Sequence, residues 1–562
     1  MKFFKLYLLA AFIISTSFNR MNAQSFTNPI LAGFYPDPSI CRAGNDYYIV
    51  VSSFAYYPGL PIFHSTDLVN WKQIGAALNR PEQLNLDGAG VSRGLFAPSI
   101  TYHKGTFYII CTLIDKGGTF VVTTTDPQKN NWSNPTWLPE IKGIDPSIFF
   151  DANDKAYIVY NSDPPDNKTL HDGHRTIRIN EFDAINSKVI SDNKIIVNGG
   201  TDMAKKPVWI EAPHLLKKDG WYYLICAEGG TGYNHSEVVF RTKTIEGPFI
   251  PYENNPILTQ RQLDRNRKNP ITTAGHADFV QTPEGKWWAV FLACRPYEAG
   301  FFNTGRETFM APVEWKNDWP IINPGFEKIQ YSYPINARRN NNPEKFSGNY
   351  LFRDDFSGNT LNNRYSFLRT VREKWYNLND GKLIIDLQPE TCSDNKNPSF
   401  IGFRQPHLKG YAATAINFKP ENDNEKAGLL VYQSEQNYYY LCRSVFEGKA
   451  VVQLFKGKGT KVAEKTTELL ISEDISGKNY KNIFFKIEAK GKTYSFYYAT
   501  ENNKWKLLKY NVDASFLSTA TAGGFVGCFY SMYATSNKVA SKSKASYDWF
   551  ECKSEDEIYK SE

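Results

Sequence analysis

The 562-residue chain lacks the features that mark several common classes of protein. None of its eight cysteines forms a Cys-x-x-Cys pair, so the sequence contains no zinc-ribbon ligand set. Beyond the first 23 residues, no apolar run is long enough to cross a bilayer. The 65 basic and 58 acidic residues are dispersed without a long basic block, which gives no support to nucleic-acid binding.

The start of the chain is typical of a secretory signal. Lys2 and Lys5 precede an apolar run over residues 6–14, and the small residue Ala23 follows. We expect residues 1–23 to be a signal peptide. No cysteine lies near the expected cleavage point, so we expect no membrane anchor. The short basic start favours an exported bacterial protein of the periplasm, with full secretion as the alternative.

A short apolar stretch carrying a polar residue, followed by a turn and an aromatic strand, occurs five times. No helical period separates the copies, which indicates radial repetition of small β-sheets. The opening stretches are residues 36–40, 97–100, 145–148, 211–215 and 275–279, and the partner strands are 47–51, 107–111, 157–160, 222–226 and 287–291. The pattern predicts a five-bladed β-propeller, in which the innermost strands of all blades converge on one axis.

The sequence predicts an all-β protein of two domains. The propeller is expected over residues 25–337, and a polar stretch without periodicity over 338–346 is expected to be a linker. Short alternating strands with turns fill residues 347–556, which we expect to form a single β-sandwich. The cysteines that lie in apolar strands are expected to be structural thiols rather than parts of a disulfide framework.

Three acidic residues open predicted inner strands: Asp37, Asp145 and Glu211. Each Asp-Pro-Ser triplet alone is an ordinary turn sequence. We take the three acidic residues to occupy equivalent positions in three blades, however, so their carboxyl groups are expected to meet at the axis. His276 opens the fifth inner strand, where it is expected either to be structural or to bond the substrate or a water. A buried carboxyl cluster is usually retained for function, and glycoside hydrolysis uses two carboxyl groups on opposite sides of the scissile bond.

The motifs together resemble glycoside hydrolase family 43, the five-bladed enzymes that remove arabinofuranose or xylose from plant polysaccharides. The C-terminal region resembles the concanavalin-like sandwich of the family's β-xylosidase branch. The resemblance is carried by Pro36-Asp37-Pro38-Ser39, Asp145-Pro146-Ser147, Glu211-Ala212-Pro213-His214, Ala227-Glu228-Gly229-Gly230-Thr231 and Gly305-Arg306-Glu307-Thr308.

The resemblance implies a role for each acidic residue. Asp37 is expected to be the general base, Glu211 the general acid, and Asp145 the residue that orients Glu211 and tunes its pKa. The family inverts the anomeric centre, so base and acid are expected to stand about 6.5 to 9.5 Å apart.

Four further residues are expected to bind the sugar. Phe54 and Phe96 are candidates for the wall of the pocket, His276 for a contact at the axis, and Arg295 for hydrogen bonds to sugar hydroxyls. Many β-xylosidases of the group read Gly-Val-Trp-Ala-Pro where this chain reads Gly94-Leu95-Phe96-Ala97-Pro98. This departure favours an exo-acting α-L-arabinofuranosidase, with a β-xylosidase or a bifunctional enzyme as the alternative.

The expected partner is a plant oligosaccharide or polysaccharide, such as xyloglucan, arabinoxylan or arabinan. The resemblance implies that no cofactor and no metal is needed for catalysis. Some members hold a calcium ion on the propeller axis, but no Asp-rich calcium loop is visible in this sequence. Two other classes share this architecture. The retaining fructosidases are disfavoured because their Arg-Asp-Pro and Glu-Cys motifs are missing from the corresponding positions here. A non-catalytic carbohydrate-binding propeller is the other alternative.

Overall fold

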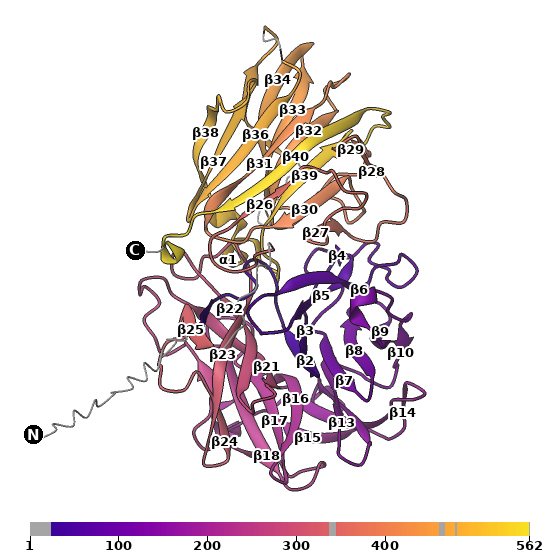
Figure 1. The fold of residues 1–562 in the computed structure, drawn as a ribbon, viewed down its shortest axis with the longest axis vertical. Helices are drawn as coiled ribbons and strands as arrows, with labels where there is room; N and C mark the ends of the chain where they lie inside the picture. The colour runs from indigo at the N-terminus through magenta and orange to yellow at the C-terminus, as the bar shows by residue number, and fades with distance from the viewer. Residues whose placement is uncertain (1–23, 336–343, 460–466, 478–479, 561–562) are drawn as a thin grey trace, which may run out of the picture.

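The computed structural model describes residues 24–335, 344–459, 467–477 and 480–560. The chain forms a propeller, coloured indigo to pink in Figure 1, and a sandwich, coloured orange to yellow. This confirms the predicted all-β class and both architectures. The predicted signal peptide and the predicted linker as far as residue 343 lie outside the described residues.

Five antiparallel sheets form the blades of the propeller. Their first strands, β2, β7, β11, β16 and β21, are neighbours in a closed ring, so the start of each blade faces the axis. Blades 1 and 2 contain β2 (Ser39–Ala43), β3 (Asp46–Val50), β5 (Gly59–Ser65) and β6 (Lys72–Leu78), then β7 (Ser99–His103), β8 (Thr106–Leu113), β9 (Gly118–Thr124) and β10 (Thr136–Trp137).

The other three blades follow in chain order. Blade 3 contains β11 (Ile144–Phe150), β12 (Ala156–Ser162), β13 (Thr176–Asp183), β14 (Lys188–Val189) and β15 (Lys194–Asn198). Blade 4 contains β16 (Glu211–Lys218), β17 (Trp221–Glu228), β18 (Ser236–Thr242), β19 (Ile250–Pro251) and β20 (Leu258–Thr259). Blade 5 contains β21 (Thr272–Gln281), β22 (Trp287–Cys294), β23 (Glu307–Lys316) and β24 (Trp319–Ile322). The ends of the domain are joined, because β1 (Gln24–Thr27) pairs with β25 (Ser332–Ile335).

The sandwich consists of two antiparallel sheets. One contains β26 (Leu351–Asp354), β28 (Tyr376–Asn379), β29 (Lys382–Asp386), β31 (Lys409–Asn417), β36 (Ile483–Lys490), β37 (Thr493–Ala499), β38 (Lys506–Asp513) and β40 (Lys544–Ser554). The other contains β27 (Tyr365–Leu368), β30 (Phe400–Arg404), β32 (Lys426–Tyr432), β33 (Tyr438–Phe446), β34 (Lys449–Lys456), β35 (Glu468–Asp474) and β39 (Phe529–Thr535). Burial alternates residue by residue along β36, as the two-residue period of a half-buried strand requires.

Helical structure in the described chain is confined to short turns. The α-helix α1 spans Thr519–Ala522. The 3-10 turns are Pro127–Lys129, Pro165–Asn167, Met203–Lys205, Ser515–Leu517 and Glu557–Tyr559. None of the helices in the described residues has the length and apolarity needed to span a membrane. All eight cysteines are buried free thiols, as the sequence predicted.

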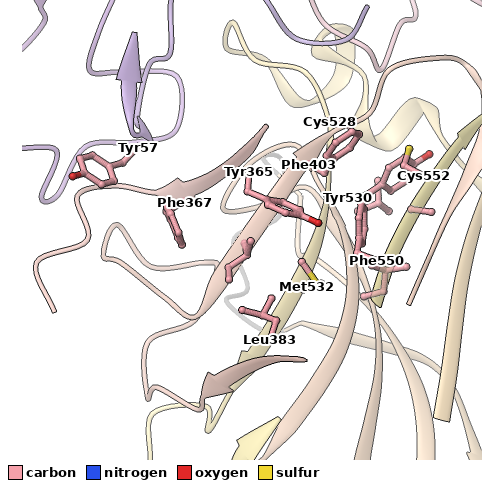
Figure 2. Close-up of a cluster of buried hydrophobic side chains, with 14 of the residues drawn as sticks. Tyr57, Tyr365, Phe367, Leu383, Phe403, Cys528, Tyr530, Met532, Phe550 and Cys552 are labelled. Atoms are coloured by element: carbon pink, nitrogen blue, oxygen red, sulfur yellow. The ribbon is translucent and has the colours of Figure 1, made fainter. Parts of the chain in front are cut away.

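The two domains share a sheet and a core. Strand β4 (Tyr56–Tyr57), which belongs to the propeller by sequence, pairs with β27 at the edge of the sandwich. Figure 2 shows Tyr57 on the propeller side of this junction, beside the strand that carries Phe367. The rings of Tyr56 and Phe529 are stacked with centroids 4.1 Å apart. Propeller and sandwich are therefore one packed body at this edge.

One residue of the predicted linker belongs to the propeller core. Phe346 is buried, and its ring contacts Phe63 and Tyr35 edge-on, with centroids 5.3 and 6.1 Å apart. A lone aromatic residue in a polar stretch carries no periodicity, so the sequence pattern did not reveal this anchor.

Truncation of the interdomain stack is expected to destabilise the protein. Phe529→Ala removes a buried ring and leaves a cavity, which typically costs about 3–5 kcal/mol. The urea midpoint of the variant, followed by tryptophan fluorescence, should fall clearly. Phe446→Ala is the matched control, since Phe446 is 46% exposed. Equal midpoints for Phe529→Ala and the wild type would contradict the packing described here.

Candidate active site

The predicted acidic residues are carried on strained turns that enter the inner strands. Asp37 and Asp145 have φ of 53° and 52°, in the left-handed region that non-glycine residues rarely occupy, and each is followed by proline. In blade 4 the residue in this conformation before proline is Ala212, with φ of 51°. Glu211 therefore stands one position earlier than the two aspartates, and the common register assumed from the sequence is wrong by one residue. The extra methylene of glutamate suits this earlier position.

His276 is the counterpart in blade 5, with φ of 57°. Backbone strain of this kind costs about 1–3 kcal/mol per residue and persists where the surroundings enforce it. Register shifts accompany the turns at the starts of β11, β16 and β21. The bulges turn side chains at the heads of these three blades towards the axis.

A cavity of about 250 Å³ lies at this end of the axis. It collects six of the seven residues that the sequence predicted for the site, Asp37, Phe54, Phe96, Asp145, Glu211 and His276. Loops of the propeller and one loop of the sandwich complete it. The further lining residues are Ala97, Ile144, Val208, Trp209, Gly230, Thr231, Arg306 and Phe525.

Asp37 is held by an ion pair and a hydroxyl group. Arg306 donates from Nη1 to Asp37 Oδ1 at 2.6 Å and from Nη2 to Oδ2 at 3.4 Å. Ser52 donates its hydroxyl hydrogen to Asp37 Oδ2 at 2.5 Å. Arg306 Nη1 also donates to Thr231 Oγ1 at 3.2 Å. The carboxyl group of Asp37 is thus fixed in orientation and faces a buried positive charge.

Glu211 and Asp145 share a desolvated environment. Burial, the charge of Asp145 and then that of Asp37 raise the pKa of Glu211 well above its usual range, although Arg306 acts in the opposite direction. Burial, followed by the charge of Asp37, raises the pKa of Asp145 to about 7. A carboxyl group whose pKa lies well above its usual range, as that of Glu211 does, holds a proton at neutral pH, which a general acid requires.

Two buried histidines flank the carboxyl groups. His276 Nδ1 lies 3.9 Å from Asp37 Oδ1, and His235 Nε2 lies 4.0 Å from Glu211 Oε1. Burial lowers the pKa of His235 to about 3. Burial, with His214 and Arg306 nearby, lowers the pKa of His276 well below its usual value. Both imidazoles are therefore neutral at neutral pH and add no positive charge to the site.

Three phenylalanine rings form an aromatic wall. Phe54 and Phe96 have centroids 5.4 Å apart. Phe525, on the loop before β39 of the sandwich, stacks on Phe54 and meets Phe96 edge-on, in both cases at 6.1 Å. The sandwich therefore contributes to the site, which no local sequence pattern indicates because Phe525 follows Phe54 by several hundred residues.

Arg295 lies elsewhere, and its predicted place in the sugar pocket is wrong. Its guanidinium donates to both carboxylate oxygens of Glu307 at 2.7 Å and to Asp556 at 3.2 Å. The side chain is buried at the boundary between the domains. Strand β22 ends at Cys294, and the next residue, Arg295, donates to the Pro406 carbonyl of the sandwich at 2.9 Å, so it lies in the interdomain contact.

The arginine of the site is Arg306, on the segment that enters β23. The signal for it was present, because Gly305-Arg306-Glu307-Thr308 was among the motifs that carried the family resemblance. Trp209 and Thr231 were also missed as lining residues. In the described residues, no group of three or more His, Cys, Asp or Glu side chains is arranged to bind a metal ion.

Residues 26–320 match glycosyl hydrolases family 43, and residues 353–553 match the β-xylosidase C-terminal concanavalin A-like domain. Together with the acidic axial cavity, this match shows that the chain belongs to glycosyl hydrolase family 43. It is a glycosidase with the five-bladed catalytic domain and appended sandwich of that family.

Relatives of similar length accompany the family match. A xylosidase/arabinosidase of Butyrivibrio fibrisolvens is 39% identical over 93% of this chain and 98% of its own. A non-reducing end α-L-arabinofuranosidase of Bacteroides ovatus is 35% identical over 94% of each chain. A solved family 43 structure from a capybara gut metagenome is 41% identical, with a TM-score of 0.85 over 92% of this chain and 96% of its own.

Neutralising Asp145 is expected to change the pH dependence of stability. The folded-state pKa of about 7 lies above the unfolded value of 3.8, so wild-type stability is lost as the pH rises from about 4 to about 7. Asp145→Asn removes this loss. Its stability relative to the wild type should increase between pH 4 and pH 8 by up to about 4 kcal/mol.

Thermal midpoints by calorimetry at both pH values measure this effect. Asp192→Asn, at an exposed position, is the control. A difference between Asp145→Asn and the wild type that is the same at pH 4 and pH 8 would show that Asp145 ionises normally.

Proposed function

We propose that this protein is an exo-acting, inverting glycoside hydrolase that releases terminal non-reducing α-L-arabinofuranose from plant cell-wall polysaccharides or oligosaccharides. The observation that carries the proposal is the convergence of Asp37, Asp145 and Glu211 with Arg306 in a single cavity of about 250 Å³. A cavity of this size, walled by aromatic rings, suits one terminal sugar whose apolar face stacks on them. A non-catalytic binding propeller would have no use for the acidic set.

Asp37 acts as the general base. Its carboxylate takes a proton from a water molecule, and the water oxygen forms a bond to the anomeric carbon. Arg306 and Ser52 hold Asp37 in orientation throughout, because both donate to its oxygens. Attack from the face opposite the leaving group inverts the anomeric centre.

Glu211 acts as the general acid. As the glycosidic bond breaks, its carboxyl proton moves to the leaving oxygen, which departs as an alcohol. The negative charge of Asp145, together with burial, keeps the proton on Glu211 until that moment. Each turnover consumes one water and moves one proton from Asp37 to Glu211 through solvent, so no cofactor takes part.

The preference for arabinofuranose is supported by the names of two relatives and by one residue. The relatives from Butyrivibrio fibrisolvens and Bacteroides ovatus both carry arabinosidase activity in their names. Phe96 supplies a smaller ring to the wall than the tryptophan that many β-xylosidases have in this place. β-Xylosidase activity, alone or combined, is the second candidate, because the sandwich matches the β-xylosidase C-terminal domain.

The parent polymer is proposed to be xyloglucan, arabinoxylan or arabinan. A solved relative, 35% identical and with a TM-score of 0.81, is described as belonging to a xyloglucan locus of Bacteroides ovatus. We further propose that the protein is exported and acts in the periplasm, on the strength of the leader-like residues 1–23.

Removal of the general acid is expected to slow hydrolysis most for substrates whose leaving group needs protonation. Glu211→Gln should lower kcat by about 10²–10⁴-fold on an arabinose-bearing oligosaccharide, and less on an aryl arabinofuranoside, whose leaving group needs little protonation. Asp37→Asn should lower both rates alike. NMR of the first product should show the inverted anomer in the wild type. An equal fall in kcat on both substrates for Glu211→Gln would show that Glu211 is not the general acid.

Sugar preference is expected to follow the ring at position 96. Initial rates on matched aryl α-L-arabinofuranoside and β-D-xylopyranoside should favour the arabinofuranoside in the wild type. Phe96→Trp should shift the ratio of kcat/KM towards the xyloside by about 10-fold, the effect of one altered pocket contact of 1–3 kcal/mol. Phe96→Leu is the control for loss of the ring. No turnover of either glycoside would refute the proposed function.

A further inference from the structure

A second and larger cavity, of about 600 Å³, lies at the seam between the propeller and the sandwich. Its propeller side is formed by residues 265–270 of the β20–β21 connection and 295–299 of the β22–β23 connection. Its sandwich side includes residues 490–492, the turn between β36 and β37. The first connection leads into the start of the inner strand β21, and the second follows the end of its antiparallel partner β22. Both connections therefore lie at the same end of the propeller as the catalytic site.

The lining of this seam cavity is strongly basic. It contains seven Lys and Arg side chains against three carboxylates. Two of the carboxylates are already engaged, because Asp556 contacts Arg295 at 3.2 Å and Glu557 lies 4.0 Å from Lys409. Four cations of the lining have no carboxylate at ion-pair distance within the described chain: Arg265, Arg267, Lys268 and Lys492.

The unpaired cations come from both domains and face one cavity. Like charges brought together in this way repel one another, and the domains cannot move apart to relieve the repulsion. Arg295 is held between them by ion pairs to Glu307 of the propeller and Asp556 of the sandwich. A Cβ at Gly491 would lie 3.5 Å from that of Tyr297, so the sandwich turn sits against the propeller loop. An anionic ligand would relieve this excess of charge.

A chain of contacts connects the loop of the seam cavity to a segment that lines the catalytic cavity. Tyr233 donates its hydroxyl hydrogen to the Leu263 carbonyl at 2.7 Å, and the Arg265 guanidinium lies 3.5 Å from the centre of the Tyr233 ring. Tyr233 is two residues from Thr231, which lines the catalytic cavity and contacts Arg306. The basic loop therefore packs against the segment that carries Thr231.

We propose that the seam cavity is a subsite for a hexuronate residue of the polysaccharide substrate, which makes acidic, pentose-bearing chains the preferred substrates. The guanidinium group of Arg265 suits the two oxygens of a uronate carboxylate, and Lys268 and Lys492 add positive charge beside it. Tyr297 and Tyr331 of the lining offer rings to the sugar. The proposal rests on the function proposed above, since it places the uronate beside a glycosidase site.

Calorimetric titration of the full chain with trigalacturonate tests the proposal, with its methyl ester as the uncharged probe. The free acid should bind and the ester should not, and binding should be lost in 0.5 M NaCl. Lys268→Gln combined with Lys492→Gln should weaken binding of the acid by about 2- to 30-fold, the range for two exposed ion pairs. Both lysines are exposed, so the double variant should fold. Lys72→Gln with Lys509→Gln, exposed at other places in the two domains, is the matched control.

A xylotetraose bearing a glucuronate branch, titrated in parallel, separates the two sources of hexuronate. Tighter binding of either probe supports the subsite and names its source. Equal binding of acid and ester, or equal weakening by both double variants, would overturn the proposal. Rates on aryl pentosides in the same preparations keep the two proposals apart. Turnover without charge-dependent binding refutes the subsite alone, whereas acid-specific binding without turnover refutes the glycosidase function and leaves the basic cavity as a uronate site.

Discussion

The burial of three carboxyl groups at one end of the propeller axis is the constraint on which the site depends. Desolvation and repulsion from neighbouring carboxylates both oppose the ionisation of Asp145 and Glu211, and Arg306 is the positive charge that opposes this effect. Because Arg306 contacts Asp37 directly, its positive charge acts more strongly on Asp37 than on the other two carboxyl groups. One carboxyl group is tied to a cation while Glu211 retains its proton, which is the difference that the proposed roles of base and acid require.

The position of Arg306 depends in turn on the contact between domains. The preceding residue, Gly305, has φ of +74°, and a Cβ there would lie 2.8 Å from the backbone of Gly527 in the sandwich. The following residue, Glu307, accepts hydrogen bonds from Gly33 and from Arg295. The sandwich thus supports the arginine of the site as well as supplying Phe525 to its wall. In this protein the second domain is part of the catalytic architecture.

Much of the fold was predictable because its signals are local and repeated. Each blade begins with a hairpin whose turn and aromatic strand lie within about twenty residues, and five copies indicate a propeller. The site was less predictable. The choice between Arg295 and Arg306 depends on where β22 ends and β23 begins, because Arg295 directly follows the first strand and Arg306 directly precedes the second. The sequence placed Glu211 in the correct cavity. That Glu211 stands one residue earlier than the two aspartates is visible only in the backbone torsion of Ala212.

By itself the sequence determined the all-β class, the number of blades, the acidic residues at the heads of three of them and the family resemblance. These properties follow from hydrophobic alternation and turn chemistry over short distances. Only the tertiary structure decided which arginine meets Asp37, that Phe525 reaches the catalytic cavity, and that cations of two domains face each other across a seam. Contacts between residues hundreds of positions apart are set by how completed domains pack, which no local pattern encodes.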